Sequence, residues 1–413
     1  MQNLALTAAW PSRIFSETFP FFARPKARST YLLMKFLCRA LCVLLIANCA
    51  LFAQQTEESI GDFEPLDDDL VLYIPKFAVK LGFRGLTGAK TSFGGTGVLS
   101  GNSFLGPDTG VDQRGYHDGF VAFDRRTVTD PAGNQVPITP DGRTNNWGFS
   151  DSTQATADGL MAFHTYTATT TDASFQEKDP PAAFGVELSV EREMGNVFGT
   201  RMKWGVIGGM SINQIATSTS AEVSADVTTV TDYYSLGGQA APNAPFTGPL
   251  SGGSVDNTPL LYSELLLRNS QTASETNAVL SSWKLRGAYL SFRAGASLFV
   301  PITERFSASF SAGAVIAYAG TTYDVNQSFT PKTGDTILTT MGSADDAFLP
   351  GYYVDANLQF AMTETSGLYL GAVYQSSGDY TQEVTSEDGL STYSTRVDLS
   401  ALQGVRAGVS FKF

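Results

Sequence analysis

Apolar and polar residues alternate along many segments of this chain. Between Phe77 and Arg84 every second residue is apolar, and the positions between them hold Lys80, Arg84 and small residues. Since successive side chains of a β-strand point to opposite faces, the pattern predicts a strand with one apolar and one polar face. The same pattern recurs at 184–191, 203–212, 290–298, 306–318, 354–360, 368–374 and 397–413.

The connections between these predicted strands are alternately long and short. The short ones lie at 194–197, 301–304 and 363–366, and the long ones at about 87–182, 217–283, 320–350 and 378–395. Transmembrane barrels have short periplasmic turns, longer extracellular loops and an even number of strands. The pattern therefore predicts an all-β fold, a closed antiparallel up-and-down transmembrane β-barrel of eight strands, with about 10–12 strands as the alternative.

The charged residues of these strands fall on the face opposite the apolar one. A sheet in lipid has to close and turn its apolar face outward, so the charged face should line the lumen. An eight-stranded barrel has room only for side chains, and we expect the charges to pair across it, with Arg84 and Arg293 each compensating a carboxylate such as Glu187 or Asp355. Which cation faces which acid depends on the shear of the barrel and is left open. A soluble β-sandwich, the alternative, would expose the same charges to water. The predicted luminal charges are Lys80, Arg84, Glu187, Glu191, Lys203, Arg293, Asp355 and Arg406.

The last residues carry a more specific pattern. Val405, Ala407, Val409, Phe411 and Phe413 alternate with polar or small residues, and the final residue is aromatic. This resembles the C-terminal signature of bacterial outer-membrane barrel proteins of the small OmpA/OmpX-like class. The resemblance implies a closing strand, with Val409, Phe411 and Phe413 as the signal that the barrel assembly machinery recognises. The first long connection departs from that class by its length.

Residues 34–53 have the layout of a secretory signal peptide. Lys35 and Arg39 precede an apolar run that is shorter than the about 20 residues of a membrane-spanning helix. We expect residues 1–33 to be an extension from a misassigned start codon, 54–72 an acidic periplasmic leader and 73–413 the barrel. The cysteines, at 38, 42 and 49, all fall within the signal. Lipidation of Cys49 is the weaker alternative, because Asn48 suits a lipidation motif poorly.

The net charge and the sequence motifs limit the classes of function that suit this chain. Residues 1–53 hold six basic and one acidic residue, so without them the formal net charge falls from −13 to −18. This acidity argues against nucleic acid as a partner. His117 and His164 leave a hydrolase conceivable, but the chain has no nucleophile elbow, phosphate loop or zinc motif. Aspartates of the first long connection could hold Ca²⁺, although Asp and Gly are also common turn residues.

The sequence thus predicts a non-enzymatic outer-membrane barrel that presents large acidic loops outside the cell, in envelope structure or surface contact. A narrow channel for ions or small solutes is the first alternative, and a barrel hydrolase is the second. We expect outer-membrane lipid and the barrel assembly machinery as partners, a monomeric state, and no cofactor or metal.

Overall fold

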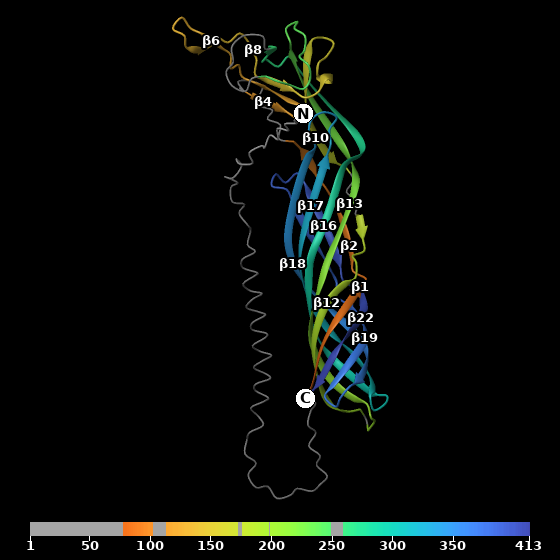
Figure 1. The fold of residues 1–413 in the computed structure, drawn as a ribbon. Helices are drawn as coiled ribbons and strands as arrows, with labels where there is room; N and C mark the ends of the chain where they lie inside the picture. Colours follow the sequence, from red (N-terminus) through yellow and green to blue (C-terminus); the bar gives the residue numbers. More distant parts are fainter. Residues whose placement is uncertain (1–76, 102–112, 172–175, 198, 249–258) are drawn as a thin grey trace, which may run out of the picture. The chain divides into compact units, whose positions relative to one another are not determined.

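The computed structural model describes residues 77–413 except 102–112, 172–175, 198 and 249–258 (Figure 1). Apart from one short 3-10 helix, η1 (Ser152–Gln154), the regular structure of this part consists of β-strands. None of its helices is long and apolar enough to cross a membrane. The predicted N-terminal extension, signal peptide and acidic leader lie outside the described residues.

Eight strands form a closed antiparallel ring in which neighbours in the chain are neighbours in the ring, and the last strand pairs with the first. The predicted eight-stranded, up-and-down barrel is confirmed. The ring strands are β1 (Phe77–Thr87), β12 (Ala183–Asn196), β13 (Lys203–Ser235), β16 (Leu267–Pro301), β17 (Phe306–Phe329), β18 (Ile337–Ala361), β19 (Ser366–Ser376) and β22 (Leu402–Lys412).

The first and last ring strands meet at the end that carries the short turns. The backbone N–H of Phe413 donates to the carbonyl of Phe77 at 2.8 Å, and the N–H of Phe77 donates back at 3.3 Å. The connections 302–305 and 362–365 turn at this same end: the N–H of Lys412 donates to the carbonyl of Thr365 at 2.8 Å, and the N–H of Ala361 donates to that of Arg305 at 2.8 Å. Short turns mark the periplasmic end of such barrels, so the long connections lie on the outer side.

Four ring strands continue far beyond the about 9–11 residues that cross a membrane. β13 and β16 pair from Lys203–Phe299 to Tyr233–Leu267, and β17 and β18 pair up to Phe329–Ile337. The predicted loops at 217–283 and 320–350 are therefore wrong, since only 236–266 and 330–336 connect these strands. Many of their Ser, Thr and Asn residues face water on the outer side of a paired sheet, and a composition of this kind is also typical of loops.

A second sheet packs against these long strands. It consists of β11 (Gln176–Lys178), β2 (Lys90–Thr96), β21 (Thr392–Asp398) and β20 (Asp379–Thr385), in that order. Phe93 of β2 stacks on Trp283 and Tyr323, with ring centroids 6.4 and 6.0 Å apart. The predicted loop 378–395 is thus mostly a hairpin, and the closing strand begins at Leu402 rather than Val397, because 392–398 turn back onto β20.

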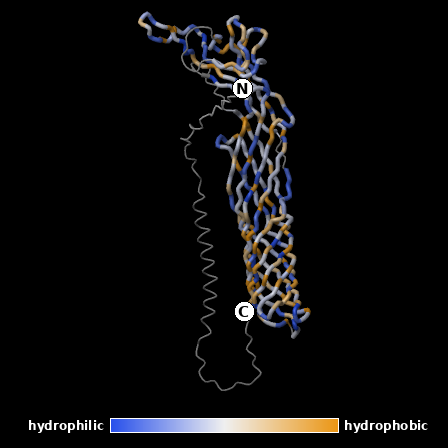
Figure 2. Tube along the Cα trace, viewed as in Figure 1, coloured by the Kyte–Doolittle hydropathy of each residue, from blue (hydrophilic) through white to orange (hydrophobic). Residues whose placement is uncertain are grey.

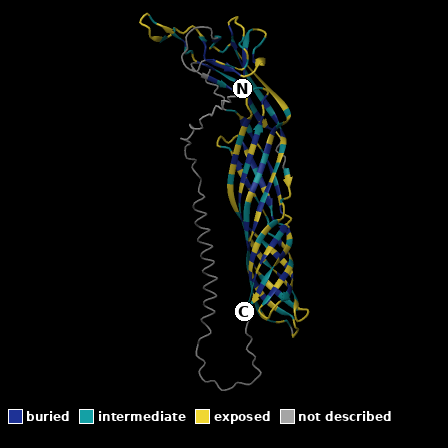
Figure 3. Cartoon of the chain, viewed as in Figure 1, coloured by how far each residue is buried: buried dark blue, intermediate teal, exposed yellow. Residues whose placement is uncertain are grey.

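We call this part the extension: 214–235, 267–288, 320–329 and 337–346 of the long strands, with the second sheet and with β3 (Val98–Ser100) and β10 (Leu160–Thr170) at the edge of the large sheet. The orientation of the two strand faces stays the same from barrel to extension, but their polarity is exchanged: the outward face is apolar in the barrel and polar in the extension. On β17, Phe310 points outward and Ser311 inward in the barrel, whereas Asp324 points outward and Tyr323 inward in the extension. Figure 3 shows the buried and exposed residues alternating along the strands, and in Figure 2 hydrophobic positions gather in the barrel.

The apolar outer band of the barrel has aromatic residues at both edges. Phe306 lies beside Phe360 near the periplasmic turns, and Tyr318 lies beside Phe348 at the outer edge, with ring centroids 5.0 and 4.8 Å apart. From Phe306 to Tyr318, about 3.3 Å per residue and a tilt of about 40° give a height of about 30 Å. This matches the hydrocarbon core of a bilayer, and places the band in the membrane.

The predicted first loop, 87–182, is also wrong, because about half of its described residues form strands. Beyond the extension, a second apolar cluster, here called the distal cluster, packs Trp147, Phe149, Phe163 and Tyr234 together. It unites β4 (Gln113–Tyr116), β5 (Gly119–Ala122), β9 (Trp147–Phe149) and β14 (Phe246–Thr247) with the outer ends of β10 and β13. The remaining short strands are β6 (Thr127–Thr129), β7 (Gln135–Pro137), β8 (Arg143–Thr144) and β15 (Leu261–Tyr262).

Candidate functional site

The barrel lumen holds most of the predicted luminal charges. Strand alternation turns them inward, and the side chains of six are almost fully buried, with a seventh, Glu191, only slightly exposed. These seven are Lys80 and Arg84 on β1, Glu187 and Glu191 on β12, Arg293 on β16, Asp355 on β18 and Arg406 on β22. The eighth, Lys203, lies at the periplasmic rim, where it is partly exposed and pairs with Glu193 at 2.9 Å.

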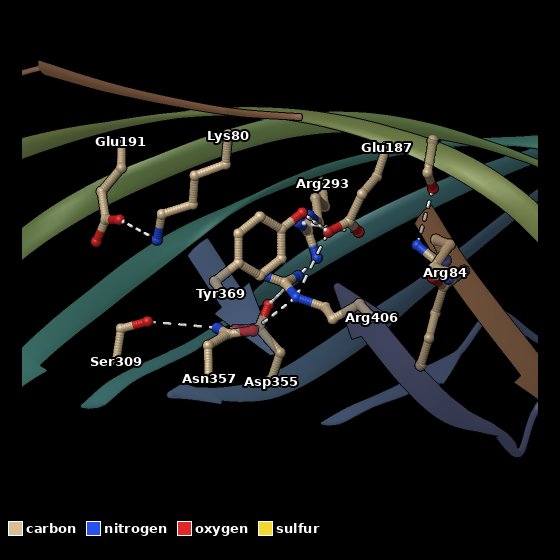
Figure 4. Close-up of polar contacts among 12 residues, drawn as sticks. Lys80, Arg84, Glu187, Glu191, Arg293, Ser309, Asp355, Asn357, Tyr369 and Arg406 are labelled. Atoms are coloured by element: carbon tan, nitrogen blue, oxygen red, sulfur yellow. Dashed lines mark hydrogen bonds and ion pairs between the residues drawn. The ribbon is translucent and has the colours of Figure 1, made fainter. Parts of the chain in front are cut away.

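Two arginines and two carboxylates form the centre of this network (Figure 4). Arg406 lies 3.0 Å from Asp355 and 3.5 Å from Glu187. Arg293 lies 3.2 Å from Asp355 and 3.5 Å from Glu187. Each carboxylate therefore faces both cations, and four strands are connected across the lumen. Removing one charged side chain of such a buried network would leave an uncompensated charge and would lower the free energy of unfolding by up to about 3–5 kcal/mol.

Neutral side chains fill the remaining hydrogen-bonding positions of this network. Tyr369 donates from its hydroxyl to Glu187 at 2.9 Å. Asn357 donates to Asp355 at 2.9 Å and accepts from Arg406 at 2.7 Å. Because Asn357 serves both as donor and as acceptor, it fixes the position of the cation and of the carboxylate. The part that Tyr369 and Asn357 play in this network was not predicted from the sequence, since neither residue carries a charge.

A separate ion pair lies nearer the periplasmic end. Lys80 donates to Glu191 at 2.7 Å across two adjacent strands, β1 and β12. Figure 4 shows this pair apart from the four central charges. Both residues were predicted from strand parity, but which cation meets which carboxylate depends on the stagger of the barrel and could not be predicted.

Arg84 differs from the expectation. It donates to Ser211 at 2.8 Å and to Gln375 at 2.9 Å, and among the described residues no carboxylate lies within 4.0 Å of it. The expected pairing of Arg84 with Glu187 or Asp355 is therefore wrong. The reason is geometric: Arg84 sits four residues further out along β1 than Lys80, opposite the neutral side chains of β13 and β19.

The lumen above Arg84 is filled mainly by apolar and aromatic side chains, with a few buried polar side chains such as Gln327 and Gln382 among them. Leu86, Tyr289 and Trp283 point inward and are almost completely buried, followed by Phe93 and Tyr323. These residues belong to one continuous cluster that fills the extension. This second closure is not predicted from the sequence, because the strand segments that provide it have the composition of loops.

The C-terminal signature residues lie on the lipid side of the closing strand. Phe411 is about half exposed and Phe413 is largely exposed, and Val409 is partly exposed on the same face. All three belong to or directly follow β22, whose neighbours are β1 and β19. Their side chains are thus available to lipid.

The two histidines meet at the outer end of the molecule. The Asp118 carboxylate lies 2.5 Å from Nδ1 of His164, accepts from the backbone N–H of His164 at 2.8 Å, and accepts from the hydroxyl of Thr333 at 2.9 Å. His117 accepts through its Nδ1 from the backbone N–H of Tyr166 at 2.8 Å. Burial lowers the pKa of His117 below its usual value, although the charge of Asp118 opposes this effect.

The Asp118–His164 pair has one element of a hydrolytic site, an imidazole oriented by a buried carboxylate. The nearby hydroxyl of Thr333 donates to Asp118, however, and this leaves it poorly placed to be activated by the imidazole. Within the described residues, no group of three or more His, Asp or Glu side chains is placed to hold a metal ion. The arrangement links the β4–β5 turn and β10 to the β17–β18 turn.

No protein-family model matches the chain, and no curated protein matches it. Similar solved structures include the outer membrane protease OmpT from Escherichia coli, with 8% identity, coverage of 82% of this chain and 97% of that chain, and a TM-score of 0.23. Others are Ail of Yersinia pestis, in complex with a heparin analogue (11%, 82% and 99%, 0.21), and OprG from Pseudomonas aeruginosa (12%, 82% and 95%, 0.24). At these identities and scores, no function transfers to this chain.

Proposed function

We propose that this outer-membrane β-barrel conducts no solute, performs no catalysis, and anchors a rigid β-structure at the cell surface for envelope structure or surface contact. The observation that carries the proposal is the double closure of the lumen. A salt-bridged network fills it at membrane level, and an apolar cluster fills it directly outside.

A channel requires a continuous path of water. At membrane level Arg406 and Asp355 are nearly inaccessible, and further out Trp283 and Tyr323 are equally buried. Moving an ion through the packed extension would remove its hydration, which is costly. The few buried polar side chains there, such as Gln327 and Gln382, already hydrogen-bond to neighbouring protein groups. The alternative of a narrow channel is therefore disfavoured.

The extension suits presentation because it is stiff. β13 and β16 stay paired from the membrane to the distal cluster, with one register shift between Val223 and Ala225. Large aromatic residues of both sheets interlock inside it, among them Phe93 and Trp283. The distal cluster at the end of this extension keeps its position relative to the membrane, whereas a flexible loop would not.

Cysteine labelling on intact cells tests the proposal. The three cysteines all precede residue 50, so single cysteines can be introduced without a background if the signal is removed. We expect a membrane-impermeant maleimide to label Ala132→Cys, at the exposed tip of the β6–β7 hairpin, and to spare Glu364→Cys in the β18–β19 turn until the membrane is permeabilised. The reverse pattern would contradict surface presentation.

A hydrolase is the second candidate, favoured by the Asp118–His164 pair alone. If that pair acts as a base, cells that display the protein should cleave fluorogenic peptides, and His164→Gln should abolish the cleavage while the boiled and unboiled protein still migrate differently on a gel. Equal rates for cells with and without the protein would exclude this activity for the peptides used.

A further inference from the structure

A pocket opens on the outer surface where the barrel passes into the extension. β12 leaves β13 after the pair Gly185–Asn213, and β10 joins β13 only from Ala225. Between these points the segment that precedes β12 lies beside β13, and the space between them forms a pocket of about 270 Å³. It is lined by outward-facing side chains of β13 and β16 and by residues 178–181.

Three cations converge on this pocket. Lys284 and Arg286 point outward from β16, since their neighbours Trp283 and Leu285 are buried in the extension. Lys178 ends β11, more than a hundred residues earlier in the chain. Among the described residues, none of the three has a carboxylate within ion-pairing distance.

The surrounding charge makes this cluster unusual. Of the pocket's lining residues only Asp179 is acidic, and Asp324 lies opposite Lys284 in the strand register without forming an ion pair. The pocket is therefore positive in a chain whose formal net charge is −13. A guanidinium and two ammonium groups suit an anion with several oxygens, such as a phosphate.

The pocket lies just outside the layer of lipid head groups, within reach of its long basic side chains. Leu290, the last large lipid-facing residue of β16, pairs with Tyr318 at the outer aromatic edge. Arg286 stands four residues further along the same face, about 13 Å along the strand and about 10 Å above the hydrocarbon once the tilt is included. Head groups occupy about 5–8 Å on each side of a bilayer, and long basic side chains reach back several Å toward them.

We propose that this pocket binds the phosphate group of an outer-leaflet lipid. The Arg286 guanidinium and the Lys284 ammonium approach the phosphate from β16, and Lys178 approaches it from the opposite wall. The volume accommodates a phosphate with part of the attached sugar or glycerol, whereas whole drug-sized ligands need about 300–1,000 Å³. The acyl chains of the same lipid would lie against the apolar band below. The proposal does not depend on the proposed function.

Lipid binding to the purified protein in phosphatidylcholine nanodiscs tests the assignment. The probe is fluorescent lipid A carrying both phosphates, compared with lipid A from which the phosphates have been removed. We expect the Lys284→Gln/Arg286→Gln variant to bind the phosphorylated probe at least tenfold more weakly. The control Arg305→Gln, an exposed arginine at the periplasmic rim, should bind it like the wild type.

Three results would overturn the proposal: equal binding of both forms of lipid A, unchanged affinity in the double variant, or binding of inorganic phosphate as tight as that of lipid A. The last would indicate a site for a free anion. Each variant is first checked for the gel shift between boiled and unboiled protein. If the double variant fails this check, Lys178→Gln, outside the ring strands, carries the test, and unchanged affinity in that variant would likewise contradict the proposal.

Discussion

The Tyr369 hydroxyl reaches Glu187 across the lumen through the space that Gly82 leaves open. A Cβ at position 82 would overlap the hydroxyl oxygen of Tyr369 and the backbone carbonyl of Ala407. The absence of a side chain at Gly82 on β1 therefore permits the hydrogen bond between Tyr369 on β19 and Glu187 on β12. This hydrogen bond joins a neutral side chain of the lumen to a charged one.

Gly82→Ala should consequently lower the free energy of unfolding by about 1–3 kcal/mol, the usual cost of overpacking a filled interior. Gly208→Ala is the matched control, because Gly208 faces outward and an added Cβ there meets only one backbone oxygen at 4.0 Å. Urea unfolding of both variants in lipid vesicles gives the comparison. Equal stabilities would mean that the lumen is looser than described.

The arginines of the lumen should differ in their contribution to stability. Arg293→Gln leaves Glu187 and Asp355 with one cation fewer, so we expect a loss that approaches about 3–5 kcal/mol. Arg84→Gln removes a buried charge that has only neutral partners within hydrogen-bonding distance, and we expect a change below about 1 kcal/mol or a small gain. Urea unfolding in lipid vesicles measures the stability of both variants. A larger loss for Arg84→Gln than for Arg293→Gln would contradict the assigned pairing.

Acidification should loosen the distal part of the protein. Burial lowers the pKa of His117 in the folded state, so the unfolded state binds more protons, and stability should fall as the pH drops through and below about 6.5. Protonation of Nδ1 would also end the hydrogen bond from Tyr166. Hydrogen exchange of β5 and β10 between pH 7.5 and 5.5 measures this. His117→Gln should reduce the pH dependence, and an unchanged dependence would assign it to another group.

Deleting Phe413 should reduce assembly strongly. The residue closes the hydrogen-bonded ring with Phe77 and presents its ring to lipid. The amount of folded protein in outer-membrane fractions, read from the gel shift before and after boiling, reports the effect. Phe413→Tyr should retain most of it. Full assembly without residue 413 would show that the signature resemblance has no consequence here.

Strand parity carried most of what the sequence could predict. The alternation from Phe77 to Arg84 and from Phe306 to Tyr318 identifies the membrane-crossing strands and the face on which each charge lies. The extension escaped prediction because its outward positions carry many Ser, Thr, Asn and Asp residues, a composition typical of loops, although inward residues such as Trp283 and Tyr323 are large and apolar. The pairing of Arg84 escaped it too, because partners across a barrel depend on the stagger between strands, which no local pattern encodes.

The proposed function requires a closed lumen, and planar-bilayer recording tests that closure most directly. With the purified, refolded protein inserted into a lipid bilayer in 1 M KCl, we expect no current steps above those of the bare membrane, because Arg406 and Asp355 seal the barrel and Trp283 closes the space above them. Insertion is verified beforehand by protease protection of the barrel. Regular, reproducible current steps from the wild-type protein would contradict a closed lumen and would favour a channel.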